Sequence, residues 1–368
     1  MNLDDLVSEL IKTKWLKRLD KISLSDVPPN ILKRKSSSRL EHSLKVYELA
    51  KVVVQNNKLP EEIAIAGLLH DMGHGPFGHV SDEFLRVDEF GKDHVAFGAE
   101  LVKGRAQEVS AILDKFKLDK SLIAEIMEGK NPRYSLFIND FLDLDCVENI
   151  FNFYKTANLS EFFNLELYDP FKVADSYTFH DDKICIDSTC TEHVKRYIEL
   201  RKAVYEWLWG GRNLKACAML GKALDIAYDD GKIDEEFFLM NNEEALNYLG
   251  SLESTKKIVR RIKTGRFCHT VLRATLLEYP VKGFVRRKRR LEMEHEIGED
   301  NNIIVVIGEA PLQKRITVPF INLKTHEFIE PDSFFSNKDL FPVYVEIYCK
   351  NRKFIGKYKE RAKSILRI

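Results

Sequence analysis

The sequence predicts a mainly helical protein that carries a small α+β domain at its C-terminal end. Two observations lead to this fold class. From the N-terminus to about residue 285, apolar residues recur at the three- and four-residue spacing of amphipathic helices. After residue 285, short runs rich in β-branched and aromatic residues replace that pattern, and one amphipathic helix closes the chain. We therefore expect a helical domain over residues 1–285 and a small α+β domain over residues 286–368.

Start and stop signals place the helices of the first part. The segment "SSSRLEHSLKVYELAKVVVQ" (36–55) begins with serines that suit an N-cap. The segment "PEEIAIAGLLHD" (60–71) opens with a proline and two acids, which favour a first helical turn, and the Gly-Pro residues after it end the helix. Helical spacing also runs through "DHVAFGAELV" (93–102), "NDFLDLDCVENIFNFY" (139–154) and "TCTEHVKRYIELRKAVYEWL" (189–208).

Strand signals are fewer and lie later in the chain. The segment "YTFHDDKICID" (177–187) predicts a short hairpin with Asp181 and Asp182 near its turn. The α+β part is predicted from three strand-like runs and a last helix: "IIVVIG" (303–308), "RITVPFI" (315–321), "VYVEIYC" (343–349) and "RKFIGKYKERAKSILRI" (352–368).

Composition excludes several classes of protein. Lysine plus arginine equals aspartate plus glutamate at 57 each, so no overall charge draws the chain to nucleic acid or to an anionic membrane. The six cysteines show no zinc-finger spacing and are expected to be free thiols in a reducing compartment. No apolar run approaches the roughly 18 residues of a membrane span, and the N-terminus does not resemble a leader peptide. We expect a cytoplasmic protein that does not bind membranes.

The segment "LLHDMGHGPFGH" (68–79) concentrates three of the ten histidines beside an aspartate. His70 and Asp71 lie where the preceding helix ends, and from a helix end both side chains can reach one ion. An imidazole nitrogen and a carboxylate oxygen suit one divalent transition metal, Mn, Fe, Co, Ni or Zn, whereas Mg becomes possible with help from substrate phosphates. The segment therefore predicts a metal site.

Two ligands hold a transition metal weakly, so others are expected from elsewhere in the chain. His42 lies on the preceding helix, and an antiparallel neighbour can bring it to the same point. Acidic candidates are Asp140, Asp143 and Asp145, in a segment apolar enough to be buried. Unpaired carboxylates are costly inside a protein, which favours a metal or a cationic partner for them. Residue spacing alone does not choose among the three.

The segments "RLEHSL", "LLHDMGHGPFGHVSDEFL", "DHVAFGAEL" and "DLDCVENI" together resemble the HD-domain phosphohydrolases. The branch that contains the deoxynucleoside triphosphate triphosphohydrolases is the most similar. The resemblance implies an HD-domain helical core in which four residues bind the metal: His42, His70, Asp71 and Asp145. It also implies that Asp143 is structural.

The same resemblance implies catalytic and substrate-binding residues. His74, His79 and His94, with Asp82 behind them, are expected to line the phosphate side, and either His79 or His94 suits the general acid. Arg39 matches an arginine that contacts the phosphates, and Arg201 matches another in some members. The implied reaction is attack of metal-activated water on the α-phosphorus of a nucleotide, which releases nucleoside and triphosphate. Several relatives are homo-oligomers, so an oligomer is expected.

The resemblance weakens around the nucleoside. Where the family has "DxDRxDYxxRD", this chain has "DLDCVENIFNFY", so Cys146 stands in place of a basic residue. Asn149 and Phe153 replace a tyrosine and an aspartate that help to hold the sugar. These departures predict altered substrate selection at an intact metal site. A phosphodiesterase, a nuclease or another nucleotide phosphatase on the same metal site is the alternative, and a regulatory nucleic-acid-binding protein ranks lowest.

Two basic clusters interrupt the otherwise balanced charge, "KKIVRRIKTGR" (256–266) and "KGFVRRKRR" (282–290). The simplest interpretation is a solvated helix face balanced by the nearby acids Glu292, Glu294 and Glu296. Other interpretations are a regulatory nucleotide, single-stranded nucleic acid or pairing between subunits.

Overall fold

The computed structural model describes residues 3–138, 141–180, 183–208, 210–276, 286–298, 303–308, 316–331 and 343–368. Within these ranges the protein is mainly helical with two small sheets, which confirms the predicted fold class. Asp140, the turn residues Asp181 and Asp182, and residues 282–285 of the second basic cluster lie outside the described residues.

The first part of the chain surrounds helix α5 (Glu62–Leu69), which is buried at every position from Ile63 to Leu69. A helix that is apolar on all sides has to lie inside the protein. Helix α4 (Arg39–Asn57) packs along α5, and the hydroxyl of Ser38 caps it as the serine run predicts. Other helices of this part are α1 (Leu3–Leu10), α2 (Lys14–Leu19), α8 (His94–Glu100), α9 (Gln107–Lys115), α10 (Lys120–Met127), α11 (Leu144–Thr156), α12 (Pro170–Asp175) and α13 (Thr191–Leu208). Helix α3 (Pro29–Leu32) instead buries Ile31 in the core of the second group of helices.

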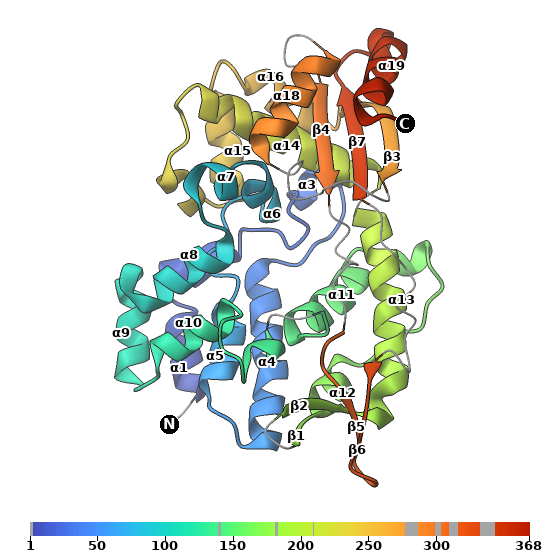
Figure 1. Ribbon diagram of the computed structural model, residues 1–368. Coiled ribbons are helices and arrows are strands. Elements are labelled where there is room, and N and C mark those ends of the chain that lie inside the picture. The colour runs from blue at the N-terminus through green and yellow to red at the C-terminus, as the bar shows by residue number, and fades with distance from the viewer. Residues whose placement is uncertain are drawn as a thin grey trace.

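A second group of helices packs around α14 (Gly211–Asp229), in the upper half of Figure 1. It includes α6 (His79–Ser81), a π-helical turn (Asp82–Arg86), α7 (Val87–Phe90), α15 (Asn242–Ser251), α16 (Lys256–Lys263), α18 (Arg287–Ile297) and α19 (Ile355–Leu366). Helix α14 contacts both α6 and the π-helical turn. The chain that follows "LLHDMG" therefore joins the two halves of the molecule.

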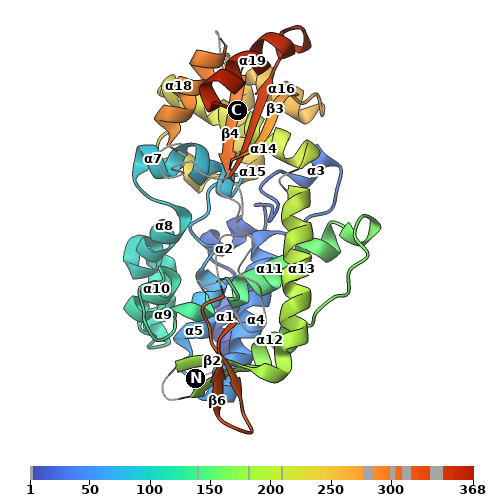
Figure 2. The same cartoon turned by 45° about the vertical axis from the view of Figure 1, so that its right-hand side comes forward.

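The two sheets lie at opposite ends of the molecule, as Figures 1 and 2 both show. One sheet has the order β1-β2-β5-β6, formed by β1 (Tyr177–His180), β2 (Lys183–Asp187), β5 (Phe320–Asn322) and β6 (Glu327–Ile329). The other has the order β3-β7-β4, formed by β3 (His269–Leu276), β7 (Val343–Cys349) and β4 (Ile303–Gly308). The β3-β7-β4 sheet is antiparallel throughout and packs against α18 and α19, with Val305, Ile347 and Met293 in a shared core.

Strand pairing crosses the domain boundary that the sequence predicts at residue 285. Strand β3 lies before the boundary but pairs with β7, and β5 lies after it but pairs in parallel with β2, where Ile186 faces Phe320. Among the described residues of the run "RITVPFI", from Ile316 on, the strand begins at Phe320. A pattern of apolar residues predicts that a strand exists, but its partner depends on the distant segment that comes to lie beside it.

The local predictions agree with the structure in most other places. Strands β1 and β2 form the expected antiparallel hairpin, with Tyr177 opposite Ile186. The runs 303–308 and 343–349 are strands, and the last segment forms α19. Among the helices that the structure describes, none has the length and the apolar character needed to cross a membrane.

Candidate active site

The sharp turn after α5 places the histidine-rich segment in the centre of the molecule. The amide of His74 donates to the carbonyl of Asp71 at 3.0 Å, which reverses the chain after the helix. Gly73 is required in this turn because a Cβ there would lie 1.9 Å from the carbonyl oxygen of His94. The turn therefore packs directly on the first turn of α8. This contact stacks the His74 and His94 rings, with centroids 3.7 Å apart.

The four residues that the resemblance implies as metal ligands converge from three helices. His42 comes from α4, His70 and Asp71 from the end of α5, and Asp145 from the first turn of α11. The Nε2 atoms of His42 and His70 lie 2.8 Å and 3.5 Å from Oδ1 of Asp145. Oδ1 of Asp71 lies 3.4 Å from Nε2 of His70. Ligand atoms of His42, His70 and Asp71 thus lie within 4.8 Å of one another, and Asp145 approaches both imidazoles.

The chemistry of these four side chains is suited to binding a cation. Nδ1 of His70 lies 2.8 Å from the carbonyl oxygen of Gly67 and can donate to it, which leaves the lone pair on Nε2. That Nε2 atom is buried and has no hydrogen-bond partner among the described residues. Because buried polar atoms are nearly always paired, an unpaired nitrogen beside two carboxylates marks a position for a cation. The donor set of imidazoles and carboxylates suits a divalent transition metal.

Asp143 and Asp145 make different contacts, although they are only two residues apart. Asp143 is buried as the N-cap of α11, where its carboxylate accepts a hydrogen bond from the amide of Cys146 at 2.6 Å. Asp145 is the second residue of the helix, and its carboxylate contacts His42 and His70. The structure therefore separates a capping carboxylate from a candidate ligand, a choice that residue spacing left open.

Glu148 is part of the site and was missed by the sequence analysis. Its carboxylate contacts Nδ1 of His42 on the side of the ring opposite Asp145. Glu148 follows Asp145 by three residues on α11, so the two lie on one helix face. That spacing was the available signal. A carboxylate behind a ligating histidine orients the ring and makes it a stronger ligand.

The charges of the group are strongly coupled. Burial opposes a charged imidazole, but Glu148 and Asp145 outweigh it and raise the pKa of His42 to about 10. Burial also opposes charge on Asp71, yet Arg39, His70 and His74 hold the pKa of its carboxyl well below its ordinary value. The metal-free site therefore carries a protonated His42 at neutral pH, and a bound cation takes the place of that proton.

We expect metal binding to release at least about one proton, that of His42, because the metal needs the lone pair that the proton occupies. The stability that His42 gives the metal-free protein is fully present below its ordinary pKa of 6.5 and is lost as the pH rises toward 10. Metal affinity rises over the same interval. Titration calorimetry with Mn²⁺ at pH 7.5, in two buffers with different ionisation enthalpies, measures the number of protons released per metal ion bound. The Glu148→Gln variant should release fewer protons than the unmodified protein. No proton release from the unmodified protein would contradict the prediction.

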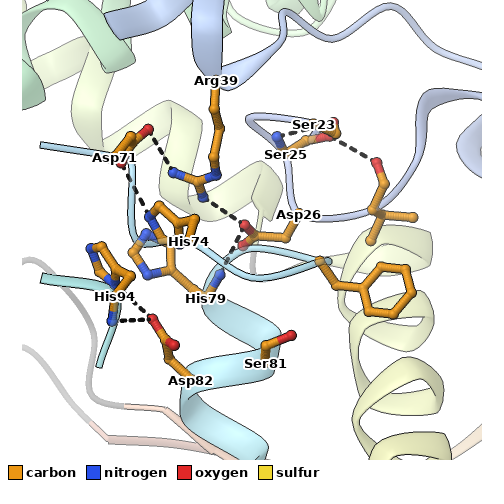
Figure 3. Close-up of polar contacts among 12 residues, drawn as sticks. Ser23, Ser25, Asp26, Arg39, Asp71, His74, His79, Ser81, Asp82 and His94 are labelled. Atoms are coloured by element: carbon orange, nitrogen blue, oxygen red, sulfur yellow. Dashed lines mark hydrogen bonds and ion pairs between the residues drawn. The ribbon is translucent and has the colours of Figure 1, made fainter. Parts of the chain in front are cut away.

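The residues that are predicted to line the phosphate side form a second cluster near Asp71 (Figure 3). His74, His79 and His94 lie ring to ring, with centroids 3.7–5.1 Å apart. Oδ2 of Asp82 accepts from Nδ1 of His94 at 2.6 Å and from its amide at 3.2 Å. Nε2 of His74 lies 3.1 Å from Oδ1 of Asp71, so this aspartate connects the two clusters.

Arg39 connects the metal-side residues to the N-terminal segment. Its Nη1 lies 3.0 Å from Oδ2 of Asp71 and its Nη2 lies 2.9 Å from Oδ1 of Asp26. Asp26 is a second residue that the sequence analysis missed, because the surrounding "LSDVPPN" carries only turn signals. Burial opposes the charge of Arg39, but the two carboxylates raise the pKa of its guanidinium above the ordinary value.

The remaining predicted substrate residues lie farther along α11 and α13. Arg201 is buried against the Phe141 ring, and its Nη1 donates to the hydroxyl of Tyr197 at 3.1 Å. Phe153 is also buried, and its ring meets that of Trp207 in the helical core. Asn149 is half-buried one helical turn after Asp145. Their roles in substrate binding stay predictions.

Two arginines of the second basic cluster are engaged inside the protein. Arg287 and Arg290 are buried, and both bind Asp225 of α14 at 2.7–2.9 Å. Arg286 pairs with Asp88, and Arg289 pairs with Glu292 and Glu296. The buried pairs remove Arg287 and Arg290 from any surface that a polyanion could bind.

In the first cluster, α16 buries Val259 and Ile262 and exposes Lys257 and Arg260, and Arg266 just after the helix is also exposed. A partner at this cluster stays a prediction.

The chain is similar to known proteins in sequence and in fold. Residues 39–135 match the model of the HD domain family. A deoxynucleoside triphosphate triphosphohydrolase SAMHD1 homolog from Dictyostelium discoideum is 21% identical over 291 residues, which cover 72% of this chain and 53% of that protein. A deoxyguanosinetriphosphate triphosphohydrolase-like protein from Brucella ovis is 38% identical over 69 residues, which cover 18% of this chain and 17% of that protein.

The fold is shared with a solved structure over nearly its whole length. A hypothetical protein from Aquifex aeolicus matches 97% of this chain and 95% of its own, with a TM-score of 0.72 and 18% identity. At that identity the match shows the fold alone. The chain spans about half the length of the Dictyostelium relative, or 53%.

Proposed function

We propose that this chain, whose residues 39–135 match the HD domain family, is a metal-dependent phosphohydrolase that acts on a nucleotide. The observation that carries the proposal is the group formed by His42, His70 and Asp71, with Asp145 beside both imidazoles and Nε2 of His70 buried without a hydrogen-bond partner among the described residues. When bound at these residues, a divalent metal supplies Lewis acidity, which lowers the pKa of water and polarises a phosphoryl oxygen.

The protein's own residues supply the rest of the chemistry. Arg39 and the histidine cluster lie on the other side of Asp71, where they can stabilise charge on a phosphoryl group. Among the three histidines, His94 has the contacts that best suit a general acid. Asp82 accepts from its Nδ1 and so orients the ring, which leaves Nε2 to donate a proton to the leaving oxygen. His79 has no such carboxylate in contact with its ring among the described residues, and it is exposed to solvent.

The proposed reaction is attack of water on the α-phosphorus of a deoxynucleoside triphosphate or a related nucleotide. The supporting observations are the site geometry and the names of two distant relatives. A homo-oligomer and a cytoplasmic location belong to the same proposal. By the resemblance, Asn149 and Phe153 replace a tyrosine and an aspartate that help to hold the sugar, which favours weaker discrimination against the ribose hydroxyl.

Product analysis tests the proposal. Metal-free protein is reloaded separately with Mn, Fe, Co, Ni, Zn or Mg and incubated with ribo- and deoxyribonucleoside triphosphates, monophosphates, cyclic nucleotides and short oligonucleotides. We expect nucleoside and inorganic triphosphate, from both sugar series. Orthophosphate, a nucleoside monophosphate or a shortened oligonucleotide would instead support the phosphatase, diesterase or nuclease alternative. No product with any metal would contradict the proposal.

Substitution of the general acid provides the control for this assay. The His94→Gln variant is expected to keep its metal but to lose turnover by roughly 100-fold or more, the usual contribution of acid–base catalysis. Metal content after dialysis and the turnover rate are measured on the same sample. Full turnover by this variant would exclude His94 as the general acid and leave His79 as the candidate.

A further inference from the structure

We propose that Asp26 occupies the position at which Arg39 and the main-chain amide of His79 bind a phosphoryl oxygen, and that Asp26 thereby determines how much negative charge the site accepts. The proposal rests on the proposed function, because it assumes that the site takes a phosphorylated ligand. It assigns to Asp26 a specificity-determining role that neither the sequence pattern nor the comparisons indicate.

Two donors converge on a single oxygen of Asp26 (Figure 3). Nη2 of Arg39 lies 2.9 Å from Oδ1, and the amide nitrogen of His79 lies 3.1 Å from the same atom. A guanidinium and a main-chain amide that meet at one oxygen form a typical cradle for an anion. Here the anion is a carboxylate of the protein itself.

Gly78 makes the space in which this oxygen lies. A Cβ at position 78 would be 2.0 Å from Oδ1 of Asp26 and 2.6 Å from Nη2 of Arg39. The φ angle of Gly78 is also positive, at 52°, a conformation that side chains rarely adopt. The glycine therefore lets a main-chain amide and a guanidinium approach the same small anion.

The cradle lies beside the reacting groups. The other guanidinium nitrogen of Arg39, Nη1, holds Asp71, and the ring of His79 packs on that of His74 at 4.9 Å between centroids. A phosphoryl group that extends from the metal-side residues toward Arg39 therefore meets the carboxylate of Asp26. Two anions do not share one pair of donors, so the ligand has to displace this carboxylate.

Asp26 is held toward the cradle by an uncommon backbone conformation. Its φ angle is 63°, in the left-handed region that favours glycine. Its amide donates to the carbonyl of Ser23 at 3.1 Å within a turn of the segment before α4. The conformation makes glycine the replacement that this backbone accepts most easily, so Asp26→Gly removes the carboxylate with little strain.

A structural role for Asp26 makes the opposite prediction. If Asp26 only positions Arg39, its removal loosens the guanidinium and weakens the binding of an anion. If Asp26 competes with the ligand, its removal frees both donors and strengthens binding. The sign of the change therefore separates the two roles without any knowledge of the natural substrate.

The test measures the binding of inorganic triphosphate to metal-free protein by titration calorimetry. We expect Asp26→Gly to bind at least about tenfold more tightly than the unmodified protein, the effect of one charge-assisted hydrogen bond. Asp26→Asn keeps the shape of the side chain and removes its charge, so it should also bind more tightly, by about threefold or more. The double variant Asp26→Gly with Arg39→Gln should lose the gain.

Asp114→Asn provides the matched control. It removes one negative charge from an exposed side chain that pairs with Lys120, and it should leave the affinity unchanged. Unchanged or weaker binding by both Asp26 variants would overturn the proposal, as would the absence of binding by every protein. Because the assay involves no hydrolysis, tighter binding by the Asp26 variants with no nucleotide turnover would contradict the proposed function and leave this inference standing.

Discussion

Replacing Asp145 with asparagine is expected to remove metal binding and to reduce hydrolysis by at least about a thousandfold. Oδ1 of Asp145 lies 2.8 Å from Nε2 of His42 and 3.5 Å from Nε2 of His70, so this carboxylate completes the group that faces the metal position. An amide carries no charge and is a weaker ligand. Metal chemistry supplies several kcal/mol to such a reaction, and each 1.36 kcal/mol is a factor of ten in rate.

The same substitution at Asp143 is the control for this prediction. Asp143 caps α11 through the amide of Cys146, and asparagine is an equally good N-cap residue. We therefore expect Asp143→Asn to keep its metal, its activity and its stability. Metal content after dialysis, turnover and thermal unfolding are measured for both variants. Equal losses in the two proteins would show that the capping and ligand roles have been assigned wrongly.

Replacing Asp225 with alanine is expected to cost the largest amount of stability, about 3–5 kcal/mol, the usual cost of removing one partner from a buried ion pair. Asp225 is 1% exposed and binds both Arg287 and Arg290, which are themselves buried. Without it, two guanidinium groups lose their main acceptor inside the protein. The loss should be measured as the free energy of unfolding in urea.

The ion pairs of Asp225 also support the segment that carries the predicted site residue Asp82. Nη2 of Arg290 donates to the carbonyl of Phe84 at 3.2 Å, within the π-helical turn that starts at Asp82. Hydrogen exchange of residues 82–90 should therefore speed up in Asp225→Ala. The control is Glu292→Gln, which breaks an exposed pair with Arg289 and should cost less than about 1 kcal/mol. A comparable loss in both variants would refute the special role of the buried pair.

Local structure could be predicted from the sequence because its causes are local. The Ser38 cap of α4, the end of α5 at His70 and the hairpin 177–187 each depend on residues a few positions apart. The partners of the strands could not be predicted in this way. Strand β5 pairs with β2, which lies more than a hundred residues earlier in the chain. The apolar pattern of a strand does not identify the strand with which it pairs.

The basic clusters show the same limit for charge. In the sequence, "VRRKRR" is a concentration of positive residues that nucleic acid could bind. In the structure, Arg287 and Arg290 form buried ion pairs with Asp225, which lies 62 and 65 residues earlier in the chain. Charge in a sequence becomes charge on a surface only where folding leaves it exposed.

The sequence by itself determined the types of residue at the site and the helices that carry them, since "LLHDMGHGPFGH" specifies both the imidazole and carboxylate groups and the break that turns them inward. Only the tertiary structure decided which groups meet. It brings Glu148 behind His42 across 106 residues, assigns capping to Asp143, and places Asp26 in the cradle of Arg39 and His79. The reason is physical: ligand types are properties of single residues, whereas orientation and competition at a site depend on how separate segments pack together.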